Sequence, residues 1–554
     1  MPATAPGSNP VIANGTTKGP VTNQQHSKLH EALPLRPRLV SIAGKDVVDG
    51  HTNAKEQLSL LRRPTTADAL TELSTAPLFS YAVLDRAQKL SRLTSTPSFS
   101  QYGLLAGDAR SLEGTSPEDP RIYYNVATPS SVFICGSQGS GKSHTLSCIL
   151  ENCLIQSSKL GDLPHPLTGL VFHYDNYASD SHVSPCEAAY LSSNPAIKVR
   201  VLCAPTNIRV VKESYSGLSN VTVEPLRLDQ AELNTKRMLE LMAFDPSSQP
   251  LYVQVIQRIL REMRLDQQEE GNAFSYQTFT NKLGEVQFMG EQKRALQQRL
   301  DTLESFMVPS QAGHKLLPHK PVVTGTHWAP KAGELIIVDL TCPCVTAPAA
   351  CALFNICLSI FLEQDSKLGR IIALDEAHRY MGESSECKIL TESLLAAVRF
   401  QRHLGARIVI STQEPTISPK LLDLCNITIV HRFSSPDWLN VLTKHLAGIS
   451  KVAKVTSGVD DETAMSEEED TSLCGLRGIS VSPDDPILDL FAQIVELHTG
   501  EALVFAPNAV VSMKVQTRST PDSAIKPKKL AHHVLRVVVR ARITEDGGRS
   551  IMAA

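Results

Sequence analysis

The 554-residue sequence has no excess of charge of either sign and few aromatic residues. Lys and Arg number 54 against 57 Asp and Glu, which gives a formal net charge of −3 at pH 7. The bulk charge therefore does not indicate a nucleic-acid-binding protein, and such a surface would need a local cluster of Lys and Arg. Apolar residues make up 42% and charged residues 20%, the fractions of an ordinary globular protein with room for two or three domains.

Long apolar runs are also missing. The most apolar segment, residues 342–363, contains two prolines and an asparagine, and its uninterrupted part is shorter than the ~20 residues that a transmembrane helix needs. We expect a helix packed against a sheet there. The first 20 residues have neither the apolar core of a signal peptide nor the Arg-rich pattern of a transit peptide. The sequence predicts a soluble intracellular protein with no membrane contact, in the nucleus or the cytoplasm.

Zinc-type cysteine spacing is absent as well. Of the 12 cysteines, Cys342 and Cys344 form a C-x-C pair, but no second Cys or His pair follows at the spacing of a zinc site. Most of the others lie in apolar runs. This pattern favours buried or free thiols in a reducing compartment.

Composition divides the chain into four segments. The segments are a disordered leader rich in Pro, Gly and Asn, a poorly defined N-terminal region, an α/β core, and a basic tail with one candidate strand: residues 1–35, 36–120, 121–515 and 516–554. Within the core, helical spacing of apolar residues predicts an all-α insertion at about 225–310. Residues 457–472 are acidic and are predicted to form a solvated loop.

Eight short β-branched runs predict the strands of the core, and helical patterns alternate with them. Several runs are apolar at nearly every position, which is typical of parallel strands covered on both faces. The sequence therefore predicts an α/β fold with a mostly parallel sheet. The predicted strands are residues 131–136, 169–175, 199–205, 334–340, 370–376, 407–413, 427–433 and 501–507.

A phosphate-binding pattern follows the first of these runs. Residues 136–143 match G-x-x-x-x-G-K-S, between an apolar strand and a predicted helix. Backbone N–H groups of such a loop surround the phosphates at the positive end of the helix. The predicted nucleotide ligands are Gly136, Ser137, Gln138, Gly139, Ser140, Gly141, Lys142, Ser143 and His144.

Two acidic residues end a later strand. Asp375 and Glu376 follow the run Ile371–Leu374, which is the pattern of a Walker B motif downstream of a P-loop. Ser143 and Asp375 are predicted to hold Mg²⁺, and Glu376 to polarise the attacking water. A GTPase would need N-K-x-D, and the nearest string, residues 280–285, has Gly284 in place of Asp. ATP with Mg²⁺ is the predicted ligand.

The tetrad Asp375-Glu376-Ala377-His378 is the one after which DEAH helicases are named, but the rest of the chain does not fit that class. The separation from the P-loop is too long and contains the helical insertion. The residues after 413 contain no Q-x-x-G-R-x-G-R element for a second helicase lobe. Residues 411–413 read S-T-Q where such helicases have S-A-T.

The motifs resemble instead those of the HerA–FtsK superfamily of ring-forming ATPases, with HerA the most similar. The resemblance runs from about residue 129 to 510 and includes "IIVDL", "DEAHRYM", the block at 402–433 and "TGEALVFAP". It implies a RecA-like P-loop core, a homo-oligomeric ring expected to be a hexamer, and translocation of double-stranded DNA. It also leaves room for a nuclease partner.

The same resemblance implies two further catalytic residues. Gln413 corresponds to a sensor of the γ-phosphate or the attacking water. Arg402, eleven residues earlier, corresponds to an arginine finger that reaches the nucleotide of the neighbouring subunit. Arg399, Arg407 and Arg432 are alternatives for this finger.

Two departures from the family limit the resemblance. Residues 36–120 show no series of alternating strands for the small barrel of HerA, and the D-x-x-G-E-Y motif keeps only Asp175 and Tyr177. Two other functions stay open: an ATP-binding regulatory or scaffold protein that switches shape without pumping, and a ring that remodels protein.

Overall fold

The computed structural model describes the chain in several ranges: residues 57–58, 60–61, 71–94, 99–177, 179–241, 251–288, 290–313, 323–364, 367–445, 486–515 and 525–548. The chain divides into two units, Met1–Arg63 and Pro64–Ala554. Only residues 57, 58, 60 and 61 of the first unit are described, so the fold below is that of the second. The predicted leader (1–35) and acidic loop (457–472) lie outside the described residues.

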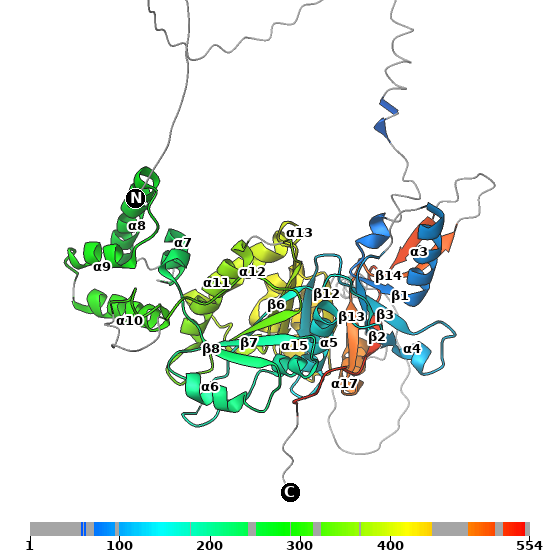
Figure 1. The fold of residues 1–554 in the computed structure, drawn as a ribbon. Coiled ribbons are helices and arrows are strands. Elements are labelled where there is room, and N and C mark those ends of the chain that lie inside the picture. Colours follow the sequence, from blue (N-terminus) through cyan, green and yellow to red (C-terminus); the bar gives the residue numbers. More distant parts are fainter. Residues whose placement is uncertain are drawn as a thin grey trace, which may run out of the picture. The chain divides into compact units, whose positions relative to one another are not determined.

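Eight neighbouring strands in the described part of the chain are parallel and form the centre of a large sheet (Figure 1). The P-loop strand β4 lies between β11 and β12, and β11 separates it from β10. This arrangement confirms the predicted α/β class. In sheet order the strands are β12 (Ile427–Val430), β4 (Ser131–Cys135), β11 (Ala406–Thr412), β10 (Arg370–Leu374), β6 (Thr168–His173), β9 (Glu334–Asp339), β7 (Lys198–Cys203) and β8 (Val221–Pro225).

Beyond β12 the sheet continues with strands from both ends of the described chain. The C-terminal strand β16 pairs antiparallel with both β13 and β2, and β5 (Gly161–Asp162) pairs with β2. Strands from either side of residues 120 and 515 pair in one sheet. The domain boundaries at these two residues stay predictions. The added strands are β13 (Glu501–Phe505), β16 (Leu535–Val539), β2 (Tyr102–Asp108), β3 (Arg121–Asn125), β1 (Leu78–Ser80), β14 (Val510–Val515) and β15 (Ile525–Lys529).

Helices cover both faces of the parallel strands because alternate residues of these strands point to opposite faces. Val132 and Ile134 of β4 pack in one core with α5 (Lys142–Leu154), whereas Phe133 and Cys135 pack in the other. The second core contains α11 (Ala347–Glu363) and α12 (Ser385–Arg399). Helix α11 begins after Thr346, whose side chain accepts a hydrogen bond from the Ala349 N–H. It occupies the segment expected to pack as a helix.

Among the described residues, the segment predicted as a helical insertion contains four α-helices that follow β8: α7 (Thr235–Leu241), α8 (Leu251–Glu270), α9 (Tyr276–Gly284) and α10 (Gly290–Phe306). In Figure 1 the last three stand at the left, beyond the end of the sheet. Their apolar residues, such as Ile256, Leu260, Leu300 and Leu303, are buried in the core that also contains α11. The helical spacing therefore identified the correct buried faces.

A separate small core lies under α3 (Tyr81–Thr94). Phe79, Val83, Phe99 and Tyr123 are buried there, with the Phe79 and Phe99 ring centroids 3.7 Å apart. The sequence showed no strand series in this region, yet β1 and β2 form here. The strand period of β2 is interrupted by a register shift between Leu104 and Ala106, which weakens the alternation of buried and exposed residues.

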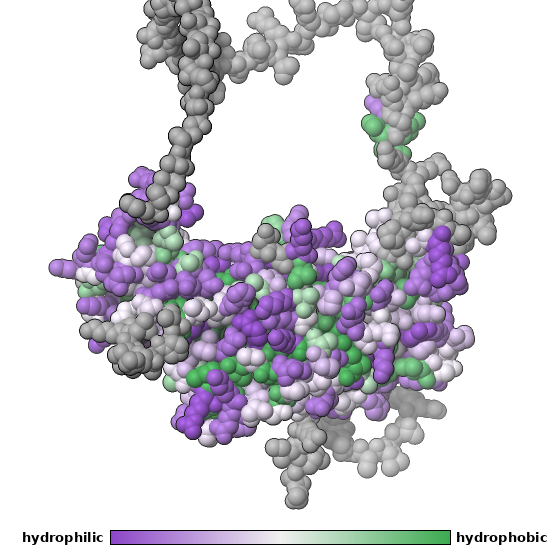
Figure 2. All heavy atoms as spheres, viewed as in Figure 1, coloured by the Kyte–Doolittle hydropathy of each residue, from purple (hydrophilic) through white to green (hydrophobic). Residues whose placement is uncertain are grey.

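Polar residues cover much of the insertion helices on the face seen in Figure 2, whereas apolar residues gather nearer the sheet. Across the described helices, none combines the length and the apolar character required to cross a bilayer.

Candidate nucleotide site at the carboxyl ends of the parallel strands

The P-loop connects β4 to α5 and has a backbone that requires glycine at its two ends. Gly136 has a φ of 152° and Gly141 a φ of 109°, values that L-residues rarely adopt. A Cβ on Gly136 would lie 2.7 Å from the His431 Cβ, and one on Gly141 would lie 3.1 Å from the Gly500 nitrogen. The loop is thus packed tightly against the ends of the neighbouring strands.

Hydrogen bonds hold this loop in an inward-curled shape. Ser137 donates from its N–H and its hydroxyl to the Arg432 carbonyl, both at 2.8 Å. Lys142 Nζ and the Ser140 hydroxyl both donate to the Ser137 carbonyl, at 3.0 and 2.7 Å. Lys142 is buried, and this burial lowers its pKa, against the opposing effect of the carboxylates Glu376 and Asp375. The lysine is therefore a buried cation close to two acids.

The remaining predicted P-loop ligands occupy different surroundings. Gln138 and Gly139 are exposed at the tip of the loop, and Ser143 is half-buried in the first turn of α5. His144 lies in the same turn, but its Nε2 is 2.8 Å from the Arg540 carbonyl, after β16. His144 therefore contacts the C-terminal strand region, whereas the other members belong to the loop and to the helix start.

His431, which sequence reasoning did not single out, forms hydrogen bonds beside the P-loop. Its Nε2 accepts a hydrogen bond from the Thr145 hydroxyl at 2.9 Å, and its Nδ1 donates to the Glu501 carbonyl at 2.8 Å. Burial lowers the pKa of His431 to about 4, so the ring is neutral at pH 7. The neutral ring joins β12, α5 and β13 beneath the loop.

The predicted acid pair follows β10, which β11 separates from the P-loop strand β4. Asp375 follows β10, and its N–H donates to the Phe172 carbonyl at 3.0 Å. Glu376 has a φ of 46°, an unfavourable left-handed backbone for a glutamate. Burial, together with the neighbouring Asp375, raises the pKa of Glu376, and Lys142 opposes this. The strained turn holds a partly desolvated carboxylate next to the P-loop lysine, as a general base requires.

Gln413 follows β11, the strand between β4 and β10, and so lies between the P-loop and the acids. Its Nε2 is 3.5 Å from the Glu376 Oε2, and its backbone N–H donates to His378 Nδ1 at 3.3 Å. Burial, with the charges of Arg379 and Lys142, lowers the pKa of His378 to about 4. His378 is thus neutral, and it is a residue of the quoted tetrad whose role the sequence did not reveal.

Asp375 fits the predicted role of a magnesium ligand. Its Oδ1 is buried and has no hydrogen-bond partner among the described residues. A carboxylate oxygen is the donor that Mg²⁺ prefers, directly or through water. The second predicted ligand, Ser143, stands next to Lys142 at the start of α5.

The candidate arginine fingers lie at opposite ends of the parallel strands. Arg402, in the short helix α13 (Gln401–Leu404), and Arg399 precede β11, whereas Gln413 follows it. Arg432 follows β12, on the P-loop side. Arg407 is buried and donates to the carbonyls of Gly405, Val126 and Ala127, at 2.8, 2.6 and 2.7 Å. The structure therefore brings Arg402 to an exposed position far from its own chain's P-loop and gives Arg407 internal partners.

Comparisons with known families, curated proteins and solved structures differ in what they match. No family model matches the chain, and no curated protein matches it in sequence. Among solved structures, VirB4 of Thermoanaerobacter pseudethanolicus matches at 10% identity and a TM-score of 0.42, over 80% of this chain and 97% of that one. The genome packaging NTPase B204 from Sulfolobus turreted icosahedral virus 2, in complex with ATP-gammaS, matches at 13% identity and a TM-score of 0.19, over 35% of this chain and 67% of that one. EssC from Geobacillus thermodenitrificans matches at 12% identity and a TM-score of 0.26, over 79% of this chain and 44% of that one. Likenesses this weak establish neither a family nor a function.

Proposed function

We propose that the protein is an ATPase of the HerA–FtsK type that binds and hydrolyses ATP in a ring and translocates double-stranded DNA. One observation carries the proposal. A glycine-dependent P-loop with a buried lysine, two acids at the end of β10 and Gln413 at the end of β11 converge on the same edge of a parallel sheet. Ligands of α/β sheets bind at this carboxyl edge.

Each group has a role in hydrolysis. The P-loop N–H groups bind the phosphates, and Lys142 neutralises charge on the β- and γ-phosphates. Glu376, whose pKa burial raises, takes up the proton of the attacking water. Gln413, whose Nε2 lies 3.5 Å from Glu376 Oε2, orients that water. Ser143 and Asp375 would hold Mg²⁺, which would offset the negative charge of the phosphates.

We expect a neighbouring subunit to supply a further cation for the transition state, and Arg402 is our candidate. It is exposed at the opposite end of β11 and has no hydrogen bond or ion pair with the described part of the chain. In a ring, that end of one subunit can face the nucleotide of the next. A finger supplied in this way makes hydrolysis depend on assembly. The hexameric state and a nuclease partner stay predictions of the resemblance.

The test is steady-state ATP hydrolysis with and without long double-stranded DNA at low salt, where contacts to phosphates are strongest. We expect DNA to raise the rate and added salt to reverse that rise. An equal mass of single-stranded DNA and an unfolded protein serve as alternative substrates. ATP binding with negligible turnover and no response to DNA would favour the scaffold or switch function. Stimulation by the unfolded protein alone would favour a protein-remodelling ring.

A further inference from the structure

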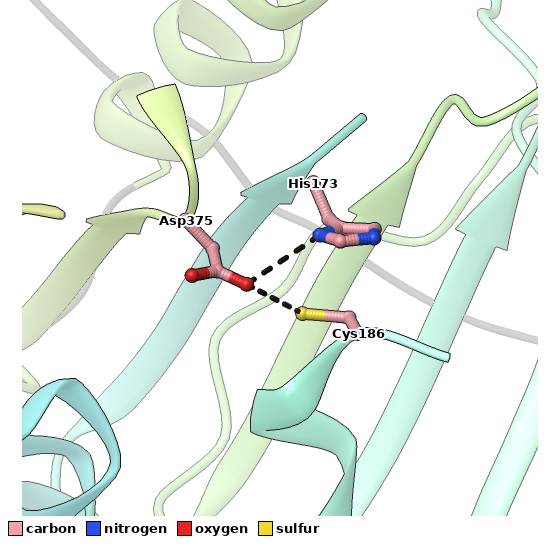
Figure 3. A group of neighbouring side chains, drawn as sticks. All are labelled: His173, Cys186 and Asp375. Atoms are coloured by element: carbon pink, nitrogen blue, oxygen red, sulfur yellow. Dashed lines mark hydrogen bonds and ion pairs between the residues drawn. The ribbon is translucent and has the colours of Figure 1, made fainter. Parts of the chain in front are cut away.

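Three buried side chains, one of which is Asp375 of the acid pair, meet near the ends of β6 and β10 (Figure 3). Their ligand atoms lie close enough together to hold a metal ion. The three residues are His173, Cys186 and Asp375, with exposed fractions of 6%, 0% and 3%, and one ligand atom from each lies within 4.8 Å of the others. Figure 3 shows His173 and Cys186 both directed at the same Asp375 oxygen. We propose that these residues bind a transition-metal ion of the zinc class, separate from the predicted Mg²⁺ position but sharing Asp375.

The fold brings the three residues together from distant parts of the sequence. Phe172 pairs with Leu374 across β6 and β10, so the next residues, His173 and Asp375, lie side by side at the ends of two parallel strands. Cys186 precedes the short helix η1 (Glu187–Ser193). No spacing motif could have revealed this set, because the members are separated by a loop and by the entire helical insertion.

The position of Cys186 is fixed by a second layer of hydrogen bonds. The Cys186 N–H donates to the Tyr215 hydroxyl at 2.8 Å, and that hydroxyl donates to Asp339 Oδ2 at 2.7 Å. Asp339 Oδ1 in turn accepts from the Thr341 N–H at 3.0 Å. All of these groups are buried. Metal ligands are typically held in place by such outer partners.

Two of the three distances between the ligand atoms match those around a tetrahedral ion. His173 Nδ1 lies 3.5 Å and Cys186 Sγ 3.7 Å from Asp375 Oδ2. Zinc bound at its usual ligand distances of about 2.0–2.3 Å separates its ligand atoms by roughly 3.3–3.8 Å. Nitrogen, sulfur and oxygen donors together are typical of zinc or cobalt, whereas Mg²⁺ and Ca²⁺ take oxygen alone. Three protein ligands leave one position open.

Unsatisfied polar atoms are the independent evidence for a ligand. Both ring nitrogens of His173 are buried without a hydrogen-bond partner in the described part of the chain. Leaving such a group unpaired is unfavourable. A bound ion would satisfy the imidazole and the carboxylate at once. Without an ion, the partial compensation is the ion pair between His173 Nδ1 and Asp375 Oδ2 at 3.5 Å.

The site has a regulatory consequence that rests on the proposed function. Asp375 is also the predicted magnesium ligand, so an ion held by His173 and Cys186 withdraws that carboxylate from the Mg²⁺–nucleotide complex. Binding of the two ions is therefore antagonistic, and each lowers the affinity of the other by the same factor. Zinc would hold the ATPase in an inactive form.

The test uses the full chain, stripped of metal with a chelator and kept reduced with a phosphine, and titrated with Co²⁺ as a spectroscopic substitute for Zn²⁺. We expect one equivalent to give a thiolate-to-cobalt absorption band that Zn²⁺ removes. Cys186→Ser and His173→Asn should lose the band. Cys387→Ser is the matched control, because its sulfur lies 3.1 Å from Cys351 Sγ in another buried thiol group, and it should keep the band. Circular dichroism of each variant verifies the fold.

A second arm adds Mg²⁺ and a non-hydrolysable ATP analogue to the cobalt-loaded wild type. The apparent Kd for Co²⁺ should rise roughly tenfold, within the range of coupled sites. No band in the wild type, or a band that persists in folded Cys186→Ser, overturns the metal site. An unchanged Kd at saturating analogue overturns the antagonism. If the analogue does not bind at all, the proposed function fails, while the cobalt titration still decides the metal site.

Discussion

The two ends of strand β11 differ in how much of a catalytic site they hold. At the carboxyl end, Gln413 lies within 3.5 Å of Glu376, which is itself close to Lys142. At the amino end, Arg402 is exposed and no acid of the described residues pairs with it, although Arg407 close by has three internal acceptors. The carboxyl end gathers the P-loop lysine, the acids and Gln413, whereas the amino end presents an exposed arginine. This comparison is the basis of our proposal that hydrolysis requires two subunits.

The largest expected effect on kcat comes from a change at the amino end of β11. Arg402→Ala should lower kcat by about 10³–10⁵, the range of arginine fingers, with nucleotide affinity little changed, because the finger acts on transition-state charge. Single-turnover hydrolysis and equilibrium nucleotide binding measure the two quantities.

Arg399→Ala is the matched control for that change, since Arg399 is also exposed and lies at the end of α12. It should keep nearly the wild-type rate. If Arg399→Ala and not Arg402→Ala abolishes turnover, the finger is Arg399 and our assignment is wrong.

The next effect is at the carboxyl end. Glu376→Gln should lower kcat by about 10²–10⁴, because it removes the base but keeps the shape of the side chain. Nucleotide binding should persist, which filter binding or a fluorescent analogue detects. Glu414→Gln, two positions beyond β11 and exposed, should be near wild type. Turnover by Glu376→Gln at the wild-type rate would exclude Glu376 as the base.

A third change separates structure from catalysis at the amino end. Arg407→Met should reduce the free energy of unfolding by about 2–5 kcal/mol, since it leaves three carbonyl groups without their charged donor. Urea denaturation measures the loss. Arg402→Ala should cost less than about 0.5 kcal/mol in the same assay, as exposed residues do. Equal losses for both would mean that Arg402 has a structural role.

The smallest effect is a pH dependence beside the P-loop. Burial holds the pKa of His431 at about 4, below the ordinary value of 6.5, so the unfolded chain binds a proton below pH 6.5 that the folded chain does not. Stability from this residue is complete above pH 6.5 and falls by about 1.4 kcal/mol per pH unit down to about pH 4.

His431→Gln should therefore flatten the decline of unfolding free energy between pH 6.5 and 5, measured by urea denaturation relative to wild type. Above pH 7 the difference between the two proteins should not vary with pH. An identical slope in both proteins below pH 6.5 would show that His431 is not the group that titrates.

Much of the fold was predictable because the parallel strands are buried on both faces. The runs that contain β4, β6, β7 and β9 to β13 are almost entirely apolar, so strands were expected at all of them. Strands β1, β2, β3, β5, β8, β14 and β15 were not predicted. They are short, irregular or partly exposed, and long-range pairing creates them. The distant strand β16 supplies the partner of β2, which local patterns do not indicate.

The site was predictable to the extent that its residues are consecutive. The P-loop and the acid pair are local motifs with a fixed mechanism, so residues 136–143, Asp375 and Glu376 could be named. His431 and the cluster of His173, Cys186 and Asp375 could not, because strand order alone makes them neighbours. Roles for Arg402 and Gln413 came from a resemblance and stay predictions.

The most direct test of a shared active site is to mix two inactive variants. Lys142→Ala subunits lack a working P-loop but carry Arg402, and Arg402→Ala subunits carry the complementary defect. If each site is completed by its neighbour, mixed rings should recover a substantial fraction of wild-type ATP hydrolysis, greatest near equal proportions. Co-assembly of the two variants, verified by differently tagged subunits, with no recovery at any ratio would contradict the account.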